Sequence, residues 1–223
     1  MDDPGLDPAS LHAALAGLRR LNSVSLADPT RWRPIARESS RAGRVLRVLD
    51  LACADGAWAV SVSLRAARRG LPLRVDGCDI NPRSVAMARR RASAAGAPCA
   101  FFRLDALRDP LPDGYDVITA SLFLHHLTDP DAQRLLERMG RAARRMVVLN
   151  DLVRSRLNLG LVRMASRALT RSPVVHDDAA RSVRAALTRA EFRAMAERAG
   201  LRGAVIGFGG LGRMSLVHRR TPR

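Results

Sequence analysis

Three apolar runs of the sequence each end in a carboxylate, and a turn of small residues follows the first. The runs end at Asp50, Asp79 and Asp105, and the turn is Ala52-Cys53-Ala54-Asp55-Gly56. Small side chains let the main chain approach a ligand closely and direct its N–H groups at the ligand. Because Asp50 would repel a pyrophosphate, a ligand with a cationic centre fits this turn better than a dinucleotide does.

Asp79 has the placement expected of a residue that binds a nucleoside. It stands near the end of the run 73–80, more than 20 residues after the small-residue turn. A carboxylate in that place can accept hydrogen bonds from both hydroxyls of a ribose. The capping role at the start of the next helix belongs to Asn81, which precedes Pro82. The sequence therefore predicts Asp79 as the anchor of a cofactor.

Histidines supply the groups that could move a proton. His125 and His126 follow the strand predicted at 117–121, and His176 lies beside Asp177 in a polar stretch. An imidazole with an ordinary pKa of about 6.5 can take a hydroxyl proton at neutral pH. Adjacent histidines cannot easily face one pocket, so we expect one of the pair to be structural. We expect the base to be His126, the member nearer the start of the next helix, with His176 second, and His125 is the remaining candidate. The alternative is that His126 caps or packs and that positioning alone drives the reaction.

The predicted elements alternate between strands and helices, which is typical of an α/β domain. Gly70 and Gly96 are predicted helix C-caps, and Thr128 and the Thr188–Glu191 capping box are predicted helix starts. A loop containing two prolines is expected at 29–34. The predicted strands are 45–51, 73–80, 99–104, 117–121, 146–149, 204–208 and 213–218, and the predicted helices are 9–21, 56–70, 82–95, 129–144, 157–169 and 188–199.

Two later segments could be misread. Residues 152–187 exceed an ordinary connection between a strand and a helix, so they predict a lid over the substrate pocket, with a polar loop at 176–184. The glycine-rich stretch 207–212 could be mistaken for a phosphate-binding loop. No helix is predicted after it and no Gly-Lys-Ser/Thr is present, so it indicates a hairpin turn.

The amino-acid composition limits the classes of protein to which the chain can belong. The chain has 223 residues and 47% hydrophobic content, which suits one folded domain. Its apolar runs are too short to span a bilayer, its N-terminus lacks a signal pattern, and its three cysteines lack metal-ligand spacing, so we expect a cytoplasmic protein with reduced thiols. All 38 basic residues are arginine and are scattered, and aromatic content is only 4%, so the net charge of +17 predicts no more than non-specific nucleic-acid binding.

The segment 48–56 resembles the first motif of the class I S-adenosylmethionine (SAM)-dependent methyltransferases, an apolar run followed by Asp-x-Gly-x-Gly-x-Gly. Ala52 and Ala54 replace the first two glycines, and Gly56 is kept. If either alanine needs a positive φ, it costs about 1 kcal/mol or more. The pattern over 111–127, a Pro-Asp-Gly turn, an aromatic-Asp pair, an apolar strand and Leu-His-His-Leu, resembles small-molecule methyltransferases of quinone and polyketide pathways.

The resemblance implies a doubly wound, Rossmann-like sheet of seven strands whose last strand runs antiparallel, with helices on both faces. It implies a methyltransferase domain over 41–223, with 152–187 as a substrate cap, and an N-terminal helical lid segment over 1–40. SAM is the implied cofactor, and Asp105 fills the place of a family acid that accepts a hydrogen bond from the adenine amino group. The implied cofactor-binding residues are Asp50, Ala52, Ala54, Gly56, Asp79, Ile80, Asp105, Ala106 and Ser121.

The implied activity is methyl transfer to a small molecule of secondary metabolism, such as the hydroxyl of a phenol, quinol or polyketide. A nucleic-acid methyltransferase is an alternative that the charge favours, but 121–123 lacks the Asn- or Asp-Pro-Pro-aromatic signature of amino-group transfer. A nicotinamide oxidoreductase is opposed by the missing glycine spacing. A non-catalytic SAM-binding relative is suggested by Ala52 and Ala54, and a homodimer is left open.

Overall fold

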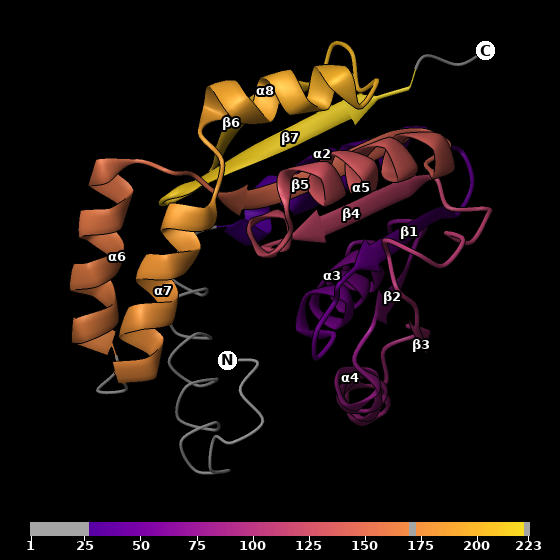
Figure 1. Ribbon diagram of the computed structural model, residues 1–223. Coiled ribbons are helices and arrows are strands. Elements are labelled where there is room, and N and C mark those ends of the chain that lie inside the picture. Colours follow the sequence, from indigo (N-terminus) through magenta and orange to yellow (C-terminus); the bar gives the residue numbers. More distant parts are fainter. Residues whose placement is uncertain (1–26, 170–172, 221–223) are drawn as a thin grey trace.

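The computed structural model describes residues 27–169 and 173–220. These residues form a seven-stranded sheet with helices packed on it (Figure 1). The strand order is β3-β2-β1-β4-β5-β7-β6, and β7 is antiparallel to both of its neighbours while the other pairs are parallel. The predicted architecture is confirmed, including the antiparallel last strand. The strands are β1 (Leu46–Leu51), β2 (Leu73–Asp79), β3 (Phe101–Arg103), β4 (Val117–Ser121), β5 (Met146–Leu152), β6 (Val205–Gly210) and β7 (Arg213–Arg219).

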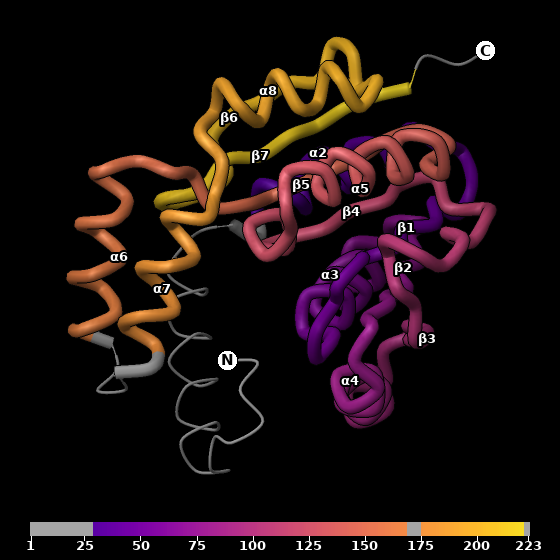
Figure 2. Tube along the Cα trace, in the orientation of Figure 1, coloured from indigo at the N-terminus to yellow at the C-terminus, as the bar shows by residue number. Residues whose placement is uncertain are grey.

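Helices cover both faces of the sheet, which is why the central strands read as nearly continuous apolar runs. Leu135 of α5 and Phe192 of α8 are buried on one face, and Ile35 of α2 and Val62 of α3 on the other. The helices α6 and α7 pack against each other at one end of the sheet (Figures 1 and 2). The helices are α2 (Ala27–Arg41), α3 (Ala57–Arg68), α4 (Pro82–Ala95), α5 (Asp129–Ala142), α6 (Arg156–Leu169), α7 (Pro173–Ala185), α8 (Arg189–Arg198) and the short 3-10 helix η1 (Leu124–His126).

The predicted end signals of the helices are confirmed. Gly70 and Gly96 adopt left-handed φ angles of 61° and 60° after α3 and α4. The side chain of Asn81 accepts a hydrogen bond from the main chain at the start of α4. Thr188 and Glu191 form both bonds of the capping box of α8. These local signals fix where the helices begin and end between the strands of the sheet.

The loop predicted at 29–34 is wrong, because this segment lies inside α2. Trp32, Ile35 and Ser39 recur at helical spacing and are all at least 95% buried. Their burial against the sheet outweighs the hydrogen bond that Pro34 removes from the middle of the helix. The predicted helix at 9–21 lies outside the described residues.

The polar loop predicted at 176–184 is also wrong, because the segment is the body of α7. Val175, Ala179 and Val183 recur every four residues and are buried. This apolar face makes the segment helical, and the intervening His-Asp-Asp cluster conceals it in the sequence.

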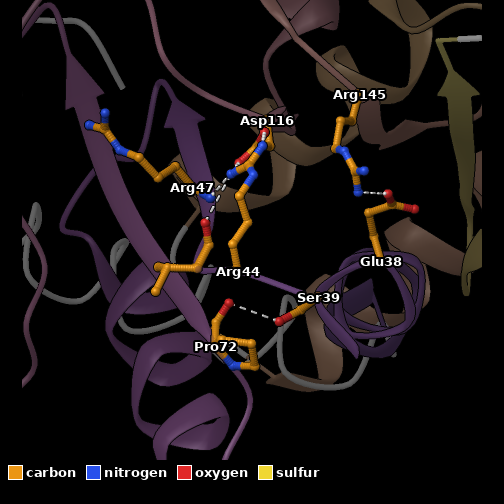
Figure 3. A network of polar contacts seen from close by, with 8 residues as sticks. Glu38, Ser39, Arg44, Arg47, Pro72, Asp116 and Arg145 are labelled. Carbon is orange, nitrogen blue, oxygen red and sulfur yellow. Dashed lines mark hydrogen bonds and ion pairs between the residues drawn. The ribbon is translucent and has the colours of Figure 1, made fainter. Parts of the chain in front are cut away.

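A buried carboxylate ties the start of β1 to the start of β4 (Figure 3). Asp116 accepts hydrogen bonds from the guanidinium of Arg44 at 2.9 and 2.5 Å and from the main-chain N–H of Arg47 at 3.0 Å. Nearby, Arg145 pairs with Glu38 of α2 at 2.7 Å. Burial by itself would raise the pKa of Asp116, but the bonds from Arg44 and Arg47 hold it below its ordinary value.

We predict that Asp116→Ala lowers the free energy of unfolding by about 1.5–3 kcal/mol, the range for hydrogen bonds to a charged acceptor. Because the folded pKa lies below the unfolded value of about 3.9, this stabilisation is complete above about pH 4 and is lost as pH falls through the folded pKa. Urea unfolding at several pH values measures the difference. Asp113→Ala, at an exposed position of the same turn, is the control. Equal stability of the two variants at neutral pH would contradict the prediction.

Candidate active site

The turn after β1 is strained in the way that its sequence suggests. Ala52, Ala54 and Gly56 have φ angles of 51°, 49° and 69°. A left-handed conformation costs an alanine about 1–2 kcal/mol. A Cβ on Gly56 would lie 2.7 Å from Ala88 and from the Phe101 ring, so only glycine fits there. The two alanines therefore hold the glycine-like conformation of the motif at an energetic cost.

Asp79 holds that turn in place. One carboxylate oxygen accepts a hydrogen bond from the N–H of Ala54 at 2.9 Å, and the other accepts from the N–H of Asn81 at 2.9 Å. A carboxylate has about four acceptor positions, so both oxygens retain capacity for a ligand. Ile80 follows with 56% of its surface exposed, which is unusual for a large apolar residue beside polar groups.

Asp105 lies at the end of the neighbouring strand β3. The N–H of Leu104 donates to the carbonyl of Asp79 at 3.1 Å, which places Asp105 next to the end of β2. One oxygen of Asp105 accepts from the N–H of Leu107 at 2.9 Å, and the side chain is 22% exposed. Ala106, the other residue expected here, is buried.

Asp50 is engaged by a residue that sequence reasoning missed. Arg31 of α2 donates to the Asp50 carboxylate at 2.9 Å, and both side chains are more than 90% buried. The same guanidinium lies 3.8 Å from the centre of the Trp58 ring. Burial raises the pKa of Asp50 to about 6, although the ion pair with Arg31 opposes the shift. No spacing rule relates Arg31 to Asp50, so only the folded structure reveals the pair.

A second strained turn follows β4. Ser121 ends that strand, half-buried, and Leu122 has a φ of 54°. This reversal directs the N–H groups of Phe123 and Leu124 at one oxygen of Asp151, at 3.1 and 2.7 Å. A leucine in this conformation is a genuine outlier. Among residues 27–169 and 173–220, every non-glycine residue with positive φ lies at this edge of the sheet, where strain marks functional sites.

The three candidate histidines occupy different surroundings. His125 has Nδ1 2.6 Å from Asp151 Oδ1, and both side chains are about 95% buried. His126 is exposed, with its ring centre 4.2 Å from that of His125. His176 is half-buried on α7. An ionised carboxylate only accepts hydrogen bonds, so a neutral His125 facing an ionised Asp151 would carry its proton on Nδ1 and present Nε2 as the acceptor.

Arg213 adds a second buried cation to this region. It begins β7 opposite Leu152, and its side chain is largely buried. Burial lowers the pKa of Arg213 to about 10, and the charge of Asp151 opposes that shift. Asp50 and Asp151 therefore each lie close to a buried guanidinium, which keeps the local charge balanced.

These groups fit SAM. The small-residue turn brings main chain to the surface at Ala54, Asp79 keeps free acceptor capacity for two hydroxyls, and Ile80 offers an exposed apolar surface beside it for a flat base. Asp105 presents a carboxylate near the same place for an amino donor. The Asp50 carboxylate suits a cationic ligand, and the Arg31 guanidinium suits a carboxylate.

The chain is similar in sequence to known methyltransferases. Residues 48–146 match the model of the methyltransferase domain family. Over 107 residues the chain is 34% identical to the demethylmenaquinone methyltransferase of Thermus thermophilus, covering 48% of this chain and 47% of that protein. Also over 107 residues, it is 30% identical to the ubiquinone biosynthesis O-methyltransferase of Chromobacterium violaceum, covering 47% of this chain and 43% of that protein. The chain thus spans about half the length of the curated relatives it matches.

Among solved structures, the plantazolicin methyltransferase BpumL aligns with a TM-score of 0.74 at 14% identity, over 96% of this chain and 92% of that one. The fold is therefore that of the Rossmann-like methyltransferases. With the motif at the end of β1, the match over 48–146 shows that the chain contains a class I SAM-dependent methyltransferase domain. Its homologues are quinone and small-molecule methyltransferases. The recognition made from the sequence motifs is confirmed.

We predict that Ala54→Gly raises the free energy of unfolding by about 0.5–1 kcal/mol, because relief of left-handed strain exceeds the added chain entropy of glycine. Ala57→Gly, three residues later in the first turn of α3, should lower it by about 0.5–1 kcal/mol. Urea unfolding of both variants measures the two changes. A loss of stability in Ala54→Gly similar to that in Ala57→Gly would show that the turn is not left-handed at residue 54.

Proposed function

We propose that this chain binds SAM at the carboxyl edge of its sheet and transfers the methyl group to a hydroxyl of a phenolic, quinol or polyketide-type small molecule. The observation that carries the proposal is the hydrogen bond between the N–H of Ala54 and Asp79, which joins the strained turn to the carboxylate best placed for a ribose. The match of 48–146 to the methyltransferase domain supports it. A cytoplasmic location remains a prediction, and homodimer formation stays open.

The cofactor would be held by residues from four segments. Asp79 would accept the ribose hydroxyls, Asp105 the adenine amino group, and Ile80 would cover one face of the base. Arg31 lies within reach of Asp50 at the turn and could exchange part of that ion pair for the carboxylate of the methionyl group. Buried charges that exchange partners in this way remain compensated throughout binding.

When bound, SAM supplies an electrophilic methyl group on a sulfonium. The protein would then position the acceptor oxygen in line, exclude water and remove the acceptor proton. We propose His125 as the base in place of His126. The hydrogen bond between His125 and Asp151 would fix the tautomer of His125 that leaves Nε2 able to accept a proton. His126 and His176 stay as the alternatives.

Several features favour a small acceptor over a nucleic acid. The segment Ser121-Leu122-Phe123 carries no amino-transfer signature, and its main chain is used to bind Asp151. One relative named above is an O-methyltransferase of ubiquinone biosynthesis, which favours a quinol or phenol hydroxyl as the acceptor here. Within the described parts of the chain, no helix is long and apolar enough to cross a membrane.

We predict that Asp79→Ala weakens binding of S-adenosylhomocysteine by about 1.5 kcal/mol or more, the contribution of hydrogen bonds to a charged acceptor. Calorimetry with the 2′-deoxyribose analogue separates ribose binding from support of the turn. The analogue should bind wild type more weakly than the parent compound does. In Asp79→Ala the two compounds should bind with equal affinity. An unchanged difference in the variant would show that Asp79 does not bind the ribose.

We predict that His125→Ala lowers kcat by about 100-fold or more, as expected for removal of a general base, while SAM affinity stays within a few-fold. Activity is measured with whichever members of a phenol and quinol panel the wild type methylates. His126→Ala and His176→Ala test the two alternative bases and should keep a kcat near that of wild type if His125 is the base. Added imidazole should restore part of the activity of His125→Ala. Wild-type kcat in all three variants would mean that positioning alone drives the transfer.

A further inference from the structure

The outer face of α6 carries an apolar stripe that no other described part of the chain covers. Leu157, Leu161 and Met164 expose 74%, 41% and 66% of their surfaces. Their spacing of four and three residues puts all three on one side of the helix. Three large apolar side chains exposed in one row differ from the single exposed leucines of ordinary surfaces, and they mark an interaction site.

The orientation of this face is fixed by the opposite side of the helix. Asn158 is buried and its amide donates to the carbonyls of Val153 and Gly212 at 2.7 and 2.8 Å. Ser166 is buried on the same side, where α6 packs against α7 (Figure 2). The apolar stripe therefore faces away from the rest of the described chain.

Arginines flank the stripe. Arg156, Arg163 and Arg167 are all exposed on α6, and at about 3.6 residues per turn they form a basic ridge along one side of the apolar row. The helix carries no acidic residue. An apolar face beside a row of arginines is the pattern of helices that lie in the surface of an anionic membrane.

The charge of the chain favours one kind of binding partner for this face over the others. A second copy would bring the same arginine ridge and another net charge of +17 against the first, which opposes self-association through this face. A nucleic acid would pair with the arginines but would leave the leucines and methionine exposed. An anionic bilayer satisfies both parts of the surface, since its headgroups pair with the arginines and its acyl region accepts the apolar row.

We propose that α6 is an interfacial helix that docks this protein on an anionic lipid bilayer, with Leu157, Leu161 and Met164 inserted below the headgroups. The helix starts directly after β5, the strand whose carboxyl end carries Asp151, so docking brings the candidate active site to the membrane surface. If the proposed function holds, the acceptor is then an apolar molecule dissolved in the bilayer; this last step rests on that function.

The test is vesicle sedimentation of the full chain at about 0.15 M salt, where long-range attraction between exposed charges is largely screened. Vesicles of phosphatidylcholine alone are compared with vesicles that also contain phosphatidylglycerol. The stripe variant is Leu157→Ser/Leu161→Ser/Met164→Ser, and its control changes three exposed apolar residues elsewhere, Val45→Ser/Met87→Ser/Val205→Ser. The ridge variant is Arg156→Gln/Arg163→Gln/Arg167→Gln, and its control with the same net charge is Arg68→Gln/Arg90→Gln/Arg193→Gln.

Wild type should bind the anionic vesicles and leave the neutral ones. The stripe variant should lose at least about tenfold in partition coefficient, because transfer of even one leucine side chain out of water contributes that much. The ridge variant should lose about fivefold per arginine, and both controls should stay within about twofold of wild type. An equal loss of vesicle binding in each variant and its control would overturn the proposal. It would show that general charge attraction accounts for the binding.

Two further outcomes would also overturn the proposal. One is a stripe variant that turns a dimer into a monomer in sedimentation velocity while vesicle binding persists, which would make the face a self-interface. The other is a stripe variant that loses RNA binding but keeps vesicle binding. SAM calorimetry on every variant separates this proposal from the proposed function, because wild type that binds SAM but no vesicles refutes only the docking, and the reverse result refutes only the function.

Discussion

Hydrogen bonds from main-chain N–H groups to the Asp79 carboxylate fix the conformation of the sheet edge where we propose that the cofactor binds. The turn after β1 is left-handed at two alanines, a conformation that each adopts at a cost of about 1–2 kcal/mol. The bond from Ala54 to Asp79 offsets part of that cost and sets the distance between the turn and the end of β2. The same carboxylate accepts from Asn81 and so fixes the start of α4. One side chain thus joins three segments around the place proposed for the ribose.

The same device appears a second time on the neighbouring strands. Leu122 is left-handed after β4, and Asp151 at the end of β5 accepts the N–H groups that the reversal exposes. Its second oxygen holds His125 at 2.6 Å. In both places a carboxylate from the next strand in the sheet stabilises a strained turn. The first turn lies beside the proposed cofactor site and the second holds a candidate base. Among the described residues, the strained non-glycine positions therefore lie in the segments that would meet ligands.

Much of this arrangement can be predicted from sequence because it depends on local chemistry. The apolar runs that end in Asp50, Asp79 and Asp105 place these residues at one edge of a parallel sheet. The sequence predicts strain in the turn only on the condition that Ala52 or Ala54 needs a positive φ, and the structure gives both residues one. The caps of the helices follow from the same kind of local signal.

Contacts between distant segments could not be predicted from the sequence. The pair of Arg31 with Asp50 and the pair of His125 with Asp151 join residues 19 and 26 positions apart, with no spacing rule to announce them. The helices α2 and α7 were missed for a related reason. A proline in one and a His-Asp-Asp cluster in the other outweigh an apolar periodicity that only burial against neighbouring elements makes decisive.

The strained turn and Asp79 together form the proposed SAM site. A crystal structure of the chain with S-adenosylhomocysteine tests this claim most directly. The ribose hydroxyls should lie within hydrogen-bond distance of the Asp79 oxygens, with Ala52 and Ala54 still left-handed and the base against Ile80. A ligand bound elsewhere, or a turn that relaxes to negative φ when the ligand is bound, would contradict the claim.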